Sequence, residues 1–212
     1  ALHEGRPLDT VQSLHFKRDG EIVETPERAK IDIDTLPPMP FELLDMEAYI
    51  AAHGSQLKGR FKGRRSATYY TSYGCPFSCS FCSEPMTSNR RWMSKSPEKV
   101  IDEIRTLSET YGVDLVVIED PIYFVDVRRV KRIAELLLEN KIDVWWTASS
   151  RLETIKKVPK ETWDVLKRAG LQQIFIGVES ASPTVLKAIG KRYTADEIVE
   201  AARILHENDV LL

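Results

Sequence analysis

The sequence lacks long hydrophobic runs, and it lacks a marked excess of charge of either sign. Its 212 residues carry a formal net charge of −2 at pH 7, so no global field attracts nucleic acid or an anionic membrane. Apolar runs such as residues 174–176 are far too short to span a bilayer. Residues 1–5 have neither the basic start nor the apolar core of a signal peptide. These absences predict a cytoplasmic protein with no membrane span and no nucleic-acid partner.

Cysteine is scarce and confined to one short segment. Cys75, Cys79 and Cys82 are the only three cysteines in the sequence. In a reducing compartment, thiols clustered in this way indicate a metal site rather than disulfides. Three thiolates on one loop can converge on a single soft metal centre. Because iron–sulfur clusters usually have four cysteine ligands, one iron of such a cluster would need another ligand here.

A zinc site made of three cysteines and one histidine is the competing interpretation. The sequence has four histidines, and His53, the nearest to the cysteines, lies 22 residues before Cys75. None of the four forms a zinc knuckle with the cysteines. Three unligated buried cysteines are a further alternative, which their density disfavours. Spacing alone therefore favours a redox-type cluster over zinc. No Ser-His-Asp arrangement, phosphate-binding loop or Gly-x-Gly-x-x-Gly motif competes with it.

Residues 1–66 show little periodicity and predict an irregular connector that contains a hairpin. Residues 14–18 and 21–24 flank Asp19-Gly20, which is a strong two-residue signal for a β-hairpin. The basic, glycine-punctuated segment 57–65 is interpreted as a solvated loop. The alternative is a rim that contacts an anionic substrate.

After residue 66, strand and helix patterns alternate. Strands are predicted at 68–73, 115–118, 144–148 and 173–177. Helices are predicted after the N-cap residues Ser96 and Asp126, at 160–169, after Ser182, and after a capping box at 194–197. Four consecutive strand–helix units predict a parallel α/β layer or barrel. A fifth strand is expected to begin at Val210.

The cysteine segment resembles the signature of radical S-adenosylmethionine (SAM) enzymes. It has the C-x₃-C-x₂-C spacing, with the aromatic residue Phe81 before the last cysteine, on the loop after the first strand. The similarity continues, in the family's order, at the ends of the next three strands, in residues 118–124, 147–151 and 176–182. It covers roughly residues 67–212. The resemblance implies an α/β fold, a partial (β/α)6 radical SAM barrel with parallel strands.

The resemblance also implies roles for the cysteines. Cys75, Cys79 and Cys82 would ligate three irons of a 4Fe–4S cluster, and SAM would bind the fourth iron. An electron from the cluster would then cleave SAM to methionine and a 5′-deoxyadenosyl radical. A small-molecule substrate and an electron donor such as flavodoxin or ferredoxin are the implied partners.

Five residues are candidate SAM contacts under this resemblance: Phe81, Asp120, Ser149, Arg151 and Glu179. Phe81 would pack near the adenine, and Asp120 would receive the ammonium group. Arg151 would grip the carboxylate as a bidentate donor, with Ser149 close to the ribose or the carboxylate. Glu179 would accept hydrogen bonds from the ribose hydroxyls or the amine. The competing interpretations are core packing for Phe81, a turn-capping acid for Asp120 and a surface ion pair for Arg151.

The N-terminal residues resemble the connector of cobalamin-binding-type radical SAM proteins, where it follows an upstream cobalamin domain. Residues 1–66 are therefore assigned as this connector, and residues 67–212 as a radical SAM core that ends before its last strands. The first residue is not Met and the last three are apolar, which favours a fragment of a longer protein. Cobalamin is expected to bind through a domain that this sequence does not contain.

The leading functional hypothesis is a cobalamin-dependent radical SAM methyltransferase or radical cyclase. One alternative is a cobalamin-independent enzyme similar to methylthiotransferases. Another is a non-catalytic module that folds around zinc. The sequence leaves the substrate open.

Overall fold

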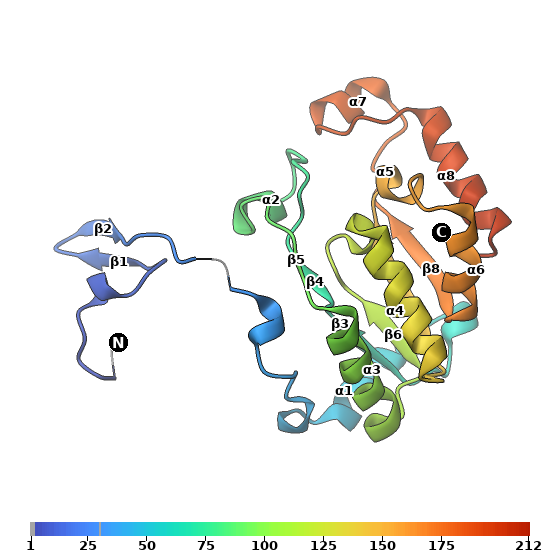
Figure 1. Cartoon of the computed structure of the whole chain (residues 1–212). Coiled ribbons are helices and arrows are strands. Elements are labelled where there is room, and N and C mark those ends of the chain that lie inside the picture. Colours follow the sequence, from blue (N-terminus) through green and yellow to red (C-terminus); the bar gives the residue numbers. More distant parts are fainter. Residues whose placement is uncertain (1–2, 30) are drawn as a thin grey trace. The chain divides into compact units, whose positions relative to one another are not determined.

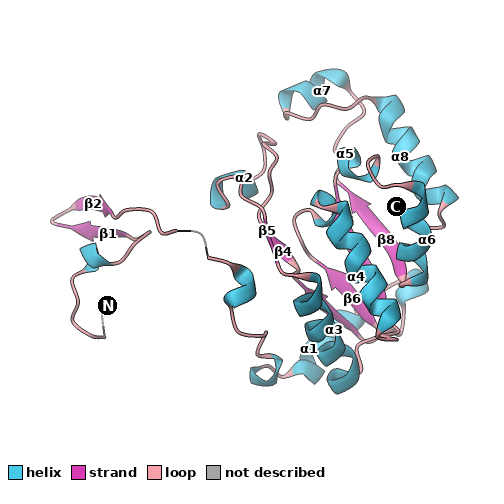
Figure 2. Ribbon diagram, in the orientation of Figure 1, coloured by secondary structure: helices cyan, strands magenta, loops and turns pink. Residues whose placement is uncertain are grey.

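A parallel four-stranded sheet is the centre of the structure, a computed structural model that describes residues 3–29 and 31–212 (Figures 1 and 2). In spatial order, which is also the chain order, the strands are β3 (Ser66–Tyr69), β6 (Leu115–Ile118), β7 (Trp145–Ser150) and β8 (Leu171–Ile176). Each strand pairs in parallel with its predecessor. This arrangement confirms the predicted α/β class with successive βαβ units.

Three long crossover helices lie side by side along the sheet (Figure 1). They are α3 (Pro97–Tyr111), α4 (Val127–Glu139) and α6 (Lys160–Arg168). The predicted N-caps begin the first two: the Ser96 side chain accepts from the Lys99 N–H, and Asp126 accepts from two backbone N–H groups. Gly112 ends α3 with a φ of 64°, in the left-handed region.

The core lies between the sheet and these helices. The strand registers place Tyr69, Ile118, Ala148 and Ile174 in one row across the sheet, and all four are buried. Because side chains alternate along a strand, the next row points to the opposite face. The buried row belongs to one hydrophobic cluster with the apolar stripes of the helices, which include Ile104, Leu107, Ile133, Leu137 and Leu166.

The segment before β3 packs onto the same body. Phe41 and Ile50 are buried members of the main core, and the helix α1 (Met46–Gly54) follows a short 3₁₀ turn at Phe41–Leu43. The Tyr49 hydroxyl of α1 hydrogen-bonds both the hydroxyl and the backbone N–H of Thr68 in β3. The larger compact unit begins at Leu36, and apolar side chains of this segment complete its core.

The basic segment 57–65 lies at the amino ends of the strands. Arg64 stacks 3.5 Å from the ring centroid of Trp145, which begins β7, and pairs with Asp114, which precedes β6. Arg65 bonds to Glu47. These cations hold the amino edge of the sheet together, whereas the cysteines follow the carboxyl end of β3. Most of the segment is nevertheless exposed, with only Leu57, Phe61 and Arg64 half-buried, as in the predicted solvated loop. Its position at the amino edge does not favour the alternative of a substrate rim.

The C-terminal part adds short and long helices after the third and fourth strands. They are α5 (Leu152–Ile155), α7 (Pro183–Ala188) and α8 (Ala195–Glu207). A second small core joins Leu152, Leu186, Tyr193 and Ala201. After α8, Leu211 makes an isolated parallel bridge to Gln173 of β8. This bridge lies where the sequence predicted the beginning of a fifth strand.

Residues 1–35 form a separate unit. The strands β1 (His15–Arg18) and β2 (Glu21–Glu24) pair antiparallel across Asp19-Gly20, whose φ angles are both positive. Positive φ at both central positions is what a tight two-residue hairpin turn requires. The predicted hairpin is confirmed. Short 3₁₀ turns at Leu8–Thr10 and Ile33–Thr35 complete the unit.

Replacement of Thr194 by Ala is expected to destabilise the protein by about 1 kcal/mol, because it removes an N-cap. The Thr194 side chain accepts from the Glu197 N–H, and the Glu197 carboxylate accepts from the Thr194 N–H, as the sequence predicted. Ser182 precedes α7 without a side-chain cap bond. Ser182→Ala is the matched control and should change the free energy of unfolding little. Equal losses of unfolding free energy in the two variants, measured by urea unfolding, would contradict the role of Thr194 as an N-cap.

Candidate functional site

The connection from β3 to α3 is a long arm that carries all three cysteines. Its base is a small antiparallel pair of β4 (Ser72–Tyr73) and β5 (Met93–Ser94), and the cysteines and the short helix α2 (Glu84–Thr87) lie beyond it. The sequence predicted one continuous strand at 68–73. The strand is interrupted at Tyr70 and Thr71, because the backbone N–H and C=O of Thr71 bond to Asp120 and Lys95 rather than to β6.

The three thiols are free and half-buried. Burial raises the pKa of the Cys75 thiol. Negative charge at Cys79 and Cys82 raises it further, whereas the Phe77 N–H and Arg151 lower it. Within the described residues, however, no three His, Cys, Asp or Glu side chains are gathered closely enough to form a ready metal site.

The donor set fits an iron–sulfur cluster by its chemistry, because three free thiols share one loop and a guanidinium lies beside them. His53, the nearest histidine in sequence, contacts the Ser66 hydroxyl at 2.5 Å. Ser66 begins β3, at the amino edge of the sheet. His53 is thus at the opposite end of the strand from the cysteines.

Gly74 lies between β4 and the first cysteine, in close contact with the other leg of the arm. Its φ is +83°, and a Cβ added there would lie 1.8 Å from the Arg91 carbonyl oxygen. No side chain can occupy that position without a shift of the backbone. The two legs of the arm approach this closely because residue 74 is glycine.

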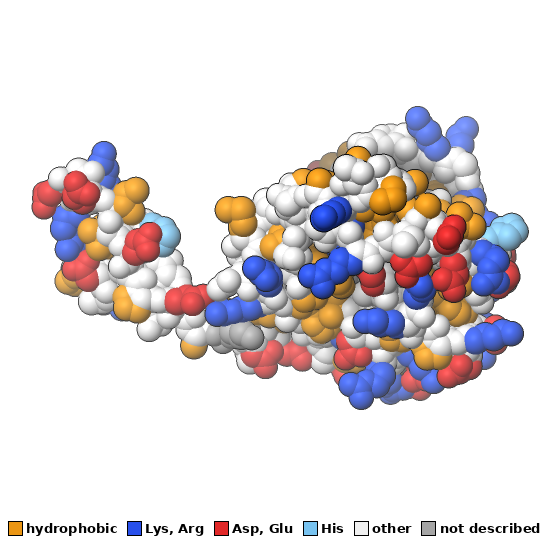
Figure 3. Space-filling view, turned by 90° about the horizontal axis from the view of Figure 1, so that it is seen from above, with side chains coloured by type: hydrophobic (Ala, Val, Ile, Leu, Met, Phe, Trp, Pro, Cys, Tyr) orange, Lys and Arg blue, Asp and Glu red, His pale blue; other side chains and the backbone are white. Residues whose placement is uncertain are grey.

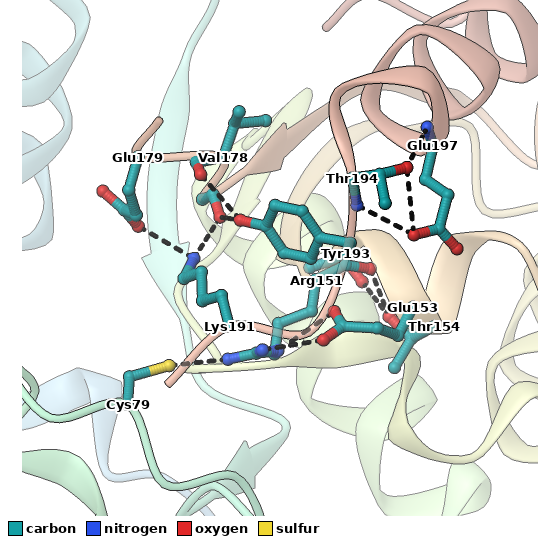
Figure 4. A network of polar contacts seen from close by, with 12 residues as sticks. Cys79, Arg151, Glu153, Thr154, Val178, Glu179, Lys191, Tyr193, Thr194 and Glu197 are labelled. Atoms are coloured by element: carbon teal, nitrogen blue, oxygen red, sulfur yellow. Dashed lines mark hydrogen bonds and ion pairs between the residues drawn. The ribbon is translucent and has the colours of Figure 1, made fainter. Parts of the chain in front are cut away.

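Arg151 lies after the carboxyl end of β7 and contacts the cysteine loop (Figure 4). Its Nη1 donates to Cys79 Sγ at 2.7 Å, and its Nε and Nη2 donate to the two carboxylate oxygens of Glu153. The guanidinium also stacks 4.1 Å from the ring centroid of Phe77. The sequence predicted a bidentate carboxylate grip by Arg151. In this structure Glu153 provides that carboxylate.

Glu179 and Lys191 form an ion pair after the carboxyl end of β8 (Figure 4). Lys191 is buried, and its Nζ donates to Glu179 Oε1 at 3.1 Å and to the Gly177 carbonyl. Glu179 has a φ of 62°, in the left-handed region that costs a residue with a Cβ about 1–2 kcal/mol. Such strain is typical of functional positions. Tyr193 adds hydrogen bonds to the Gly177 and Val178 carbonyls, and burial raises its pKa to about 12.

Phe81 and Ser149 lie at the same edge of the sheet. Phe81 is 58% exposed, so it is not a core residue, and the Lys191 ammonium lies 5.9 Å from its ring centroid. Ser149 is opposite Phe175 in the pairing of β7 with β8. Since Ala148 belongs to the row that faces the helices, Ser149 points to the opposite face of the sheet, where it is half-buried.

Asp120 is placed differently from the other candidates. It is 1% exposed, and it accepts hydrogen bonds from the Thr71 N–H, the Thr71 hydroxyl and the Ser72 hydroxyl, each at 2.6 Å. Burial raises the pKa of this carboxyl. Its oxygens are occupied by the base of the arm, which favours the alternative interpretation, an acid that caps a turn.

The tip of the arm docks on the turn after α7. The Ser80 N–H donates to the Ile189 carbonyl at 3.2 Å, and the Ser80 hydroxyl donates to the Ala188 carbonyl. These bonds bring the cysteine loop to the side of Lys191. Viewed from above, basic and hydrophobic side chains are interspersed over the face of the larger unit (Figure 3). The structure therefore brings Cys79, Phe81, Arg151, Glu179 and Lys191 together.

A family model described as the radical SAM superfamily matches residues 69–211, well over half of the chain. The chain belongs to the radical SAM superfamily. The matched segment contains the cysteine arm and all four parallel strands except the first residues of β3. None of the helices in the described part of the chain has both the length and the apolar character needed to cross a bilayer.

Relatives of this radical SAM chain include an uncharacterized methyltransferase of Pyrococcus horikoshii, 33% identical over 96% of the chain and 42% of the relative. The anaerobic magnesium-protoporphyrin IX monomethyl ester cyclase of Synechocystis sp. is 26% identical over 100% of the chain and 40% of the relative. The chain thus spans less than half of the length of either relative.

A solved structure with the same fold is that of OxsB, a cobalamin-dependent S-adenosylmethionine radical enzyme, with aqua-cobalamin and S-adenosylmethionine bound. Its TM-score is 0.79 at 23% identity, over 100% of this chain and 30% of that one. The likeness confirms the predicted partial radical SAM barrel.

Sequence reasoning gave Lys191 no role, and it missed Glu153 and Phe77. Lys191 follows Gly190 within a segment that is similar to the family, which was the signal available. The contact of Phe77 with Arg151 joins segments that are more than 70 residues apart along the chain. The contact of Glu153 with Arg151 is local but depends on one side-chain orientation. A linear pattern does not carry such information.

Gly74→Ala is expected to cost about 1–2 kcal/mol for the positive φ and about 1–3 kcal/mol more for displacement of the backbone. Gly63→Ala is the matched control, because Gly63 has a φ of +82° and no heavy atom within 4 Å of an added Cβ. Gly63→Ala should lose only the unfolding free energy that the positive φ costs, about 1–2 kcal/mol. Urea unfolding of both variants measures the difference, and equal losses would mean that the close approach of the two legs is not required.

Proposed function

We propose that the protein is a radical SAM enzyme whose Cys75, Cys79 and Cys82 hold a 4Fe–4S cluster. The observation that carries the proposal is the placement of three free thiols on a loop that contacts Arg151 and the end of α7, at the carboxyl edge of a radical SAM sheet. Membership in the family supports both the cluster and SAM as cofactors. When bound, the cluster supplies the electron that cleaves SAM to methionine and a 5′-deoxyadenosyl radical.

The charged residues at this edge suit the two ends of SAM. Lys191 offers a buried ammonium to a carboxylate, and Glu179, with 41% of its side chain exposed, offers acceptor oxygens to ribose hydroxyls or an amine. Phe81 offers an exposed ring to the adenine, and Ser149 offers a half-buried hydroxyl on the face of the sheet opposite the helices. Arg151 is proposed to orient Cys79 while it remains paired with Glu153. Asp120 is left out of this set, because the base of the arm uses its oxygens.

The reaction is proposed to be cobalamin-dependent methyl transfer or radical cyclisation. The relatives named a methyltransferase and a cyclase support these two classes, and the fold shared with OxsB is consistent with cobalamin. Residues 1–66 would connect the core at 67–212 to the domain that binds cobalamin. A small molecule is the proposed substrate, and flavodoxin or ferredoxin the proposed electron donor in the cytoplasm.

Anaerobic reconstitution of the full chain with iron and sulfide tests the proposal. Iron and labile sulfide should be present at about four each per chain if one 4Fe–4S cluster binds. Addition of SAM and a strong reductant should then yield 5′-deoxyadenosine. Purified protein that holds one zinc and no iron, and that never forms 5′-deoxyadenosine, would overturn the radical mechanism in favour of a zinc module.

Cys79→Ala and Glu179→Ala should separate cluster binding from SAM binding. Cys79→Ala is expected to lose the cluster, because it removes a ligand. Glu179→Ala should keep the iron content of the wild type but bind SAM about 10- to 100-fold more weakly, the factor expected for a charge-assisted hydrogen bond. Equilibrium binding of SAM to the reconstituted protein measures this. Glu109→Ala, which removes an exposed carboxylate of α3, is the control. A full cluster in Cys79→Ala would refute the ligand assignment.

A further inference from the structure

The base of the cysteine arm, which we call the neck, is too small to be stable by itself. It consists of Thr71, the two strands β4 and β5 of two residues each, and Lys95, whose N–H donates to the Thr71 carbonyl at 2.9 Å. An isolated two-stranded hairpin is at best marginally stable in water. The position of the arm therefore depends on what the neck is bonded to.

Arg129 bonds to both legs of the neck at once. Its Nε donates to the Lys95 carbonyl at 2.8 Å, and its Nη2 donates to the Thr71 carbonyl at 3.0 Å. The residue is 8% exposed and lies in the first turn of α4, after β6. Among the described residues its Nη1 has no hydrogen-bond partner. A planar guanidinium is suited to span two carbonyls, because its donors point in fixed directions.

Asp120 bonds to the same neck through Thr71 and Ser72. Its carboxylate accepts from the Thr71 N–H, the Thr71 hydroxyl and the Ser72 hydroxyl, as described above. The Ser72 hydroxyl in turn accepts from Trp92 Nε1 at 3.1 Å, across the neck. Thr71 is thus bonded through its N–H and hydroxyl to Asp120 and through its carbonyl to Arg129. Both charged residues come from the connection that follows β6, the neighbour of β3.

A buried ion pair between Lys95, which belongs to the neck, and Glu103 of α3 also anchors the neck. Lys95 Nζ bonds to Glu103 Oε2 at 2.5 Å, and the Tyr69 hydroxyl donates to the same oxygen. Lys95, Glu103 and Tyr69 are 6%, 4% and 2% exposed. The buried group around the neck therefore contains two cations and two carboxyl groups. Loss of one partner would leave the others buried and unpaired, which is costly.

We propose that Arg129 and Asp120 are positioning residues for the iron–sulfur site: they fix the neck at the carboxyl edge of the sheet and so determine where the three thiols are presented. The inference rests on the proposed function only in that the arm holds the cluster. In the described structure the side-chain hydrogen bonds of these two residues go to Thr71, Ser72 and Lys95, and not to a thiol or to Phe81, Ser149, Arg151 or Glu179. Their effect on the cysteines passes through Thr71, Ser72 and the backbone of the arm.

Arg129→Gln in the full chain tests the proposal, with Arg128→Gln as the matched control. Arg128 is the adjacent residue of α4, and its side chain is 96% exposed. Two measurements are made. The first is amide hydrogen exchange of the metal-free protein, resolved for the arm and for the strands β6 and β7. The second is the rate at which a chelator removes iron from the reconstituted protein, together with the electron paramagnetic resonance spectrum of the reduced cluster.

Arg129→Gln should raise exchange in residues 72–94 about tenfold or more, the factor that one hydrogen bond to a charged group is worth, and leave β6 and β7 within about twofold of the control. Iron loss should accelerate by a similar factor, with a shifted or broadened resonance spectrum. A uniform rise in exchange, or unchanged iron loss and spectrum, would overturn the proposal. A wild-type protein that takes up no iron would count against the proposed function. Amide hydrogen exchange of the metal-free protein would still show whether Arg129 fixes the neck.

Asp120→Asn and Asp120→Ala keep the proposal testable if Arg129→Gln does not fold. Asn has the same shape, and its amide can bond to the Thr71 N–H and to hydroxyls that rotate to accept. Ala removes the carboxylate to which all three groups donate. Exchange in residues 72–94 and iron loss should therefore be close to the wild type in Asp120→Asn and about tenfold faster in Asp120→Ala. Equal behaviour of the two variants would overturn the role of Asp120.

Discussion

The hydrogen bonds that Thr71 makes to Asp120 and Arg129 are the interaction on which the rest of the site depends. A parallel sheet fixes the direction of each strand, but it leaves the long connection after β3 free to choose its path. Two oppositely charged side chains from the next connection remove that freedom. They are tolerated in the interior because each is paired with several polar groups of the neck.

The sheet topology explains why residues far apart in sequence meet. All four strands run in the same direction and follow one another in space, so what leaves one carboxyl end lies beside what leaves the next. The cysteine arm follows β3, Arg151 follows β7, and Glu179 follows β8. Lys191 comes later still, but the docking of Ser80 on the end of α7 returns it to the cysteine loop. The arrangement concentrates cations beside the thiols.

Much of the fold could be predicted from the sequence, because its signals are local. The caps at Ser96, Asp126 and Thr194 involve neighbours within three residues, and the hairpin at Asp19-Gly20 is a two-residue signal. The contact of Arg151 with Cys79 joins residues 72 apart, and only the fold decides it. Asp120 shows the limit most clearly: its place after an apolar strand indicated a polar role, but not whether its partner is a ligand or Thr71.

The helix α1 has a consequence for the behaviour of the chain in solution. In the described structure β3 is an edge strand that pairs with β6 on one side. Its other side presents backbone N–H and C=O groups, through which edge strands of different molecules can pair and aggregate. The Tyr49 hydroxyl occupies one of these groups, the Thr68 N–H, and α1 lies along the strand. The helix α1 therefore covers part of this strand edge and leaves fewer backbone groups of β3 open to pairing with a strand of another molecule.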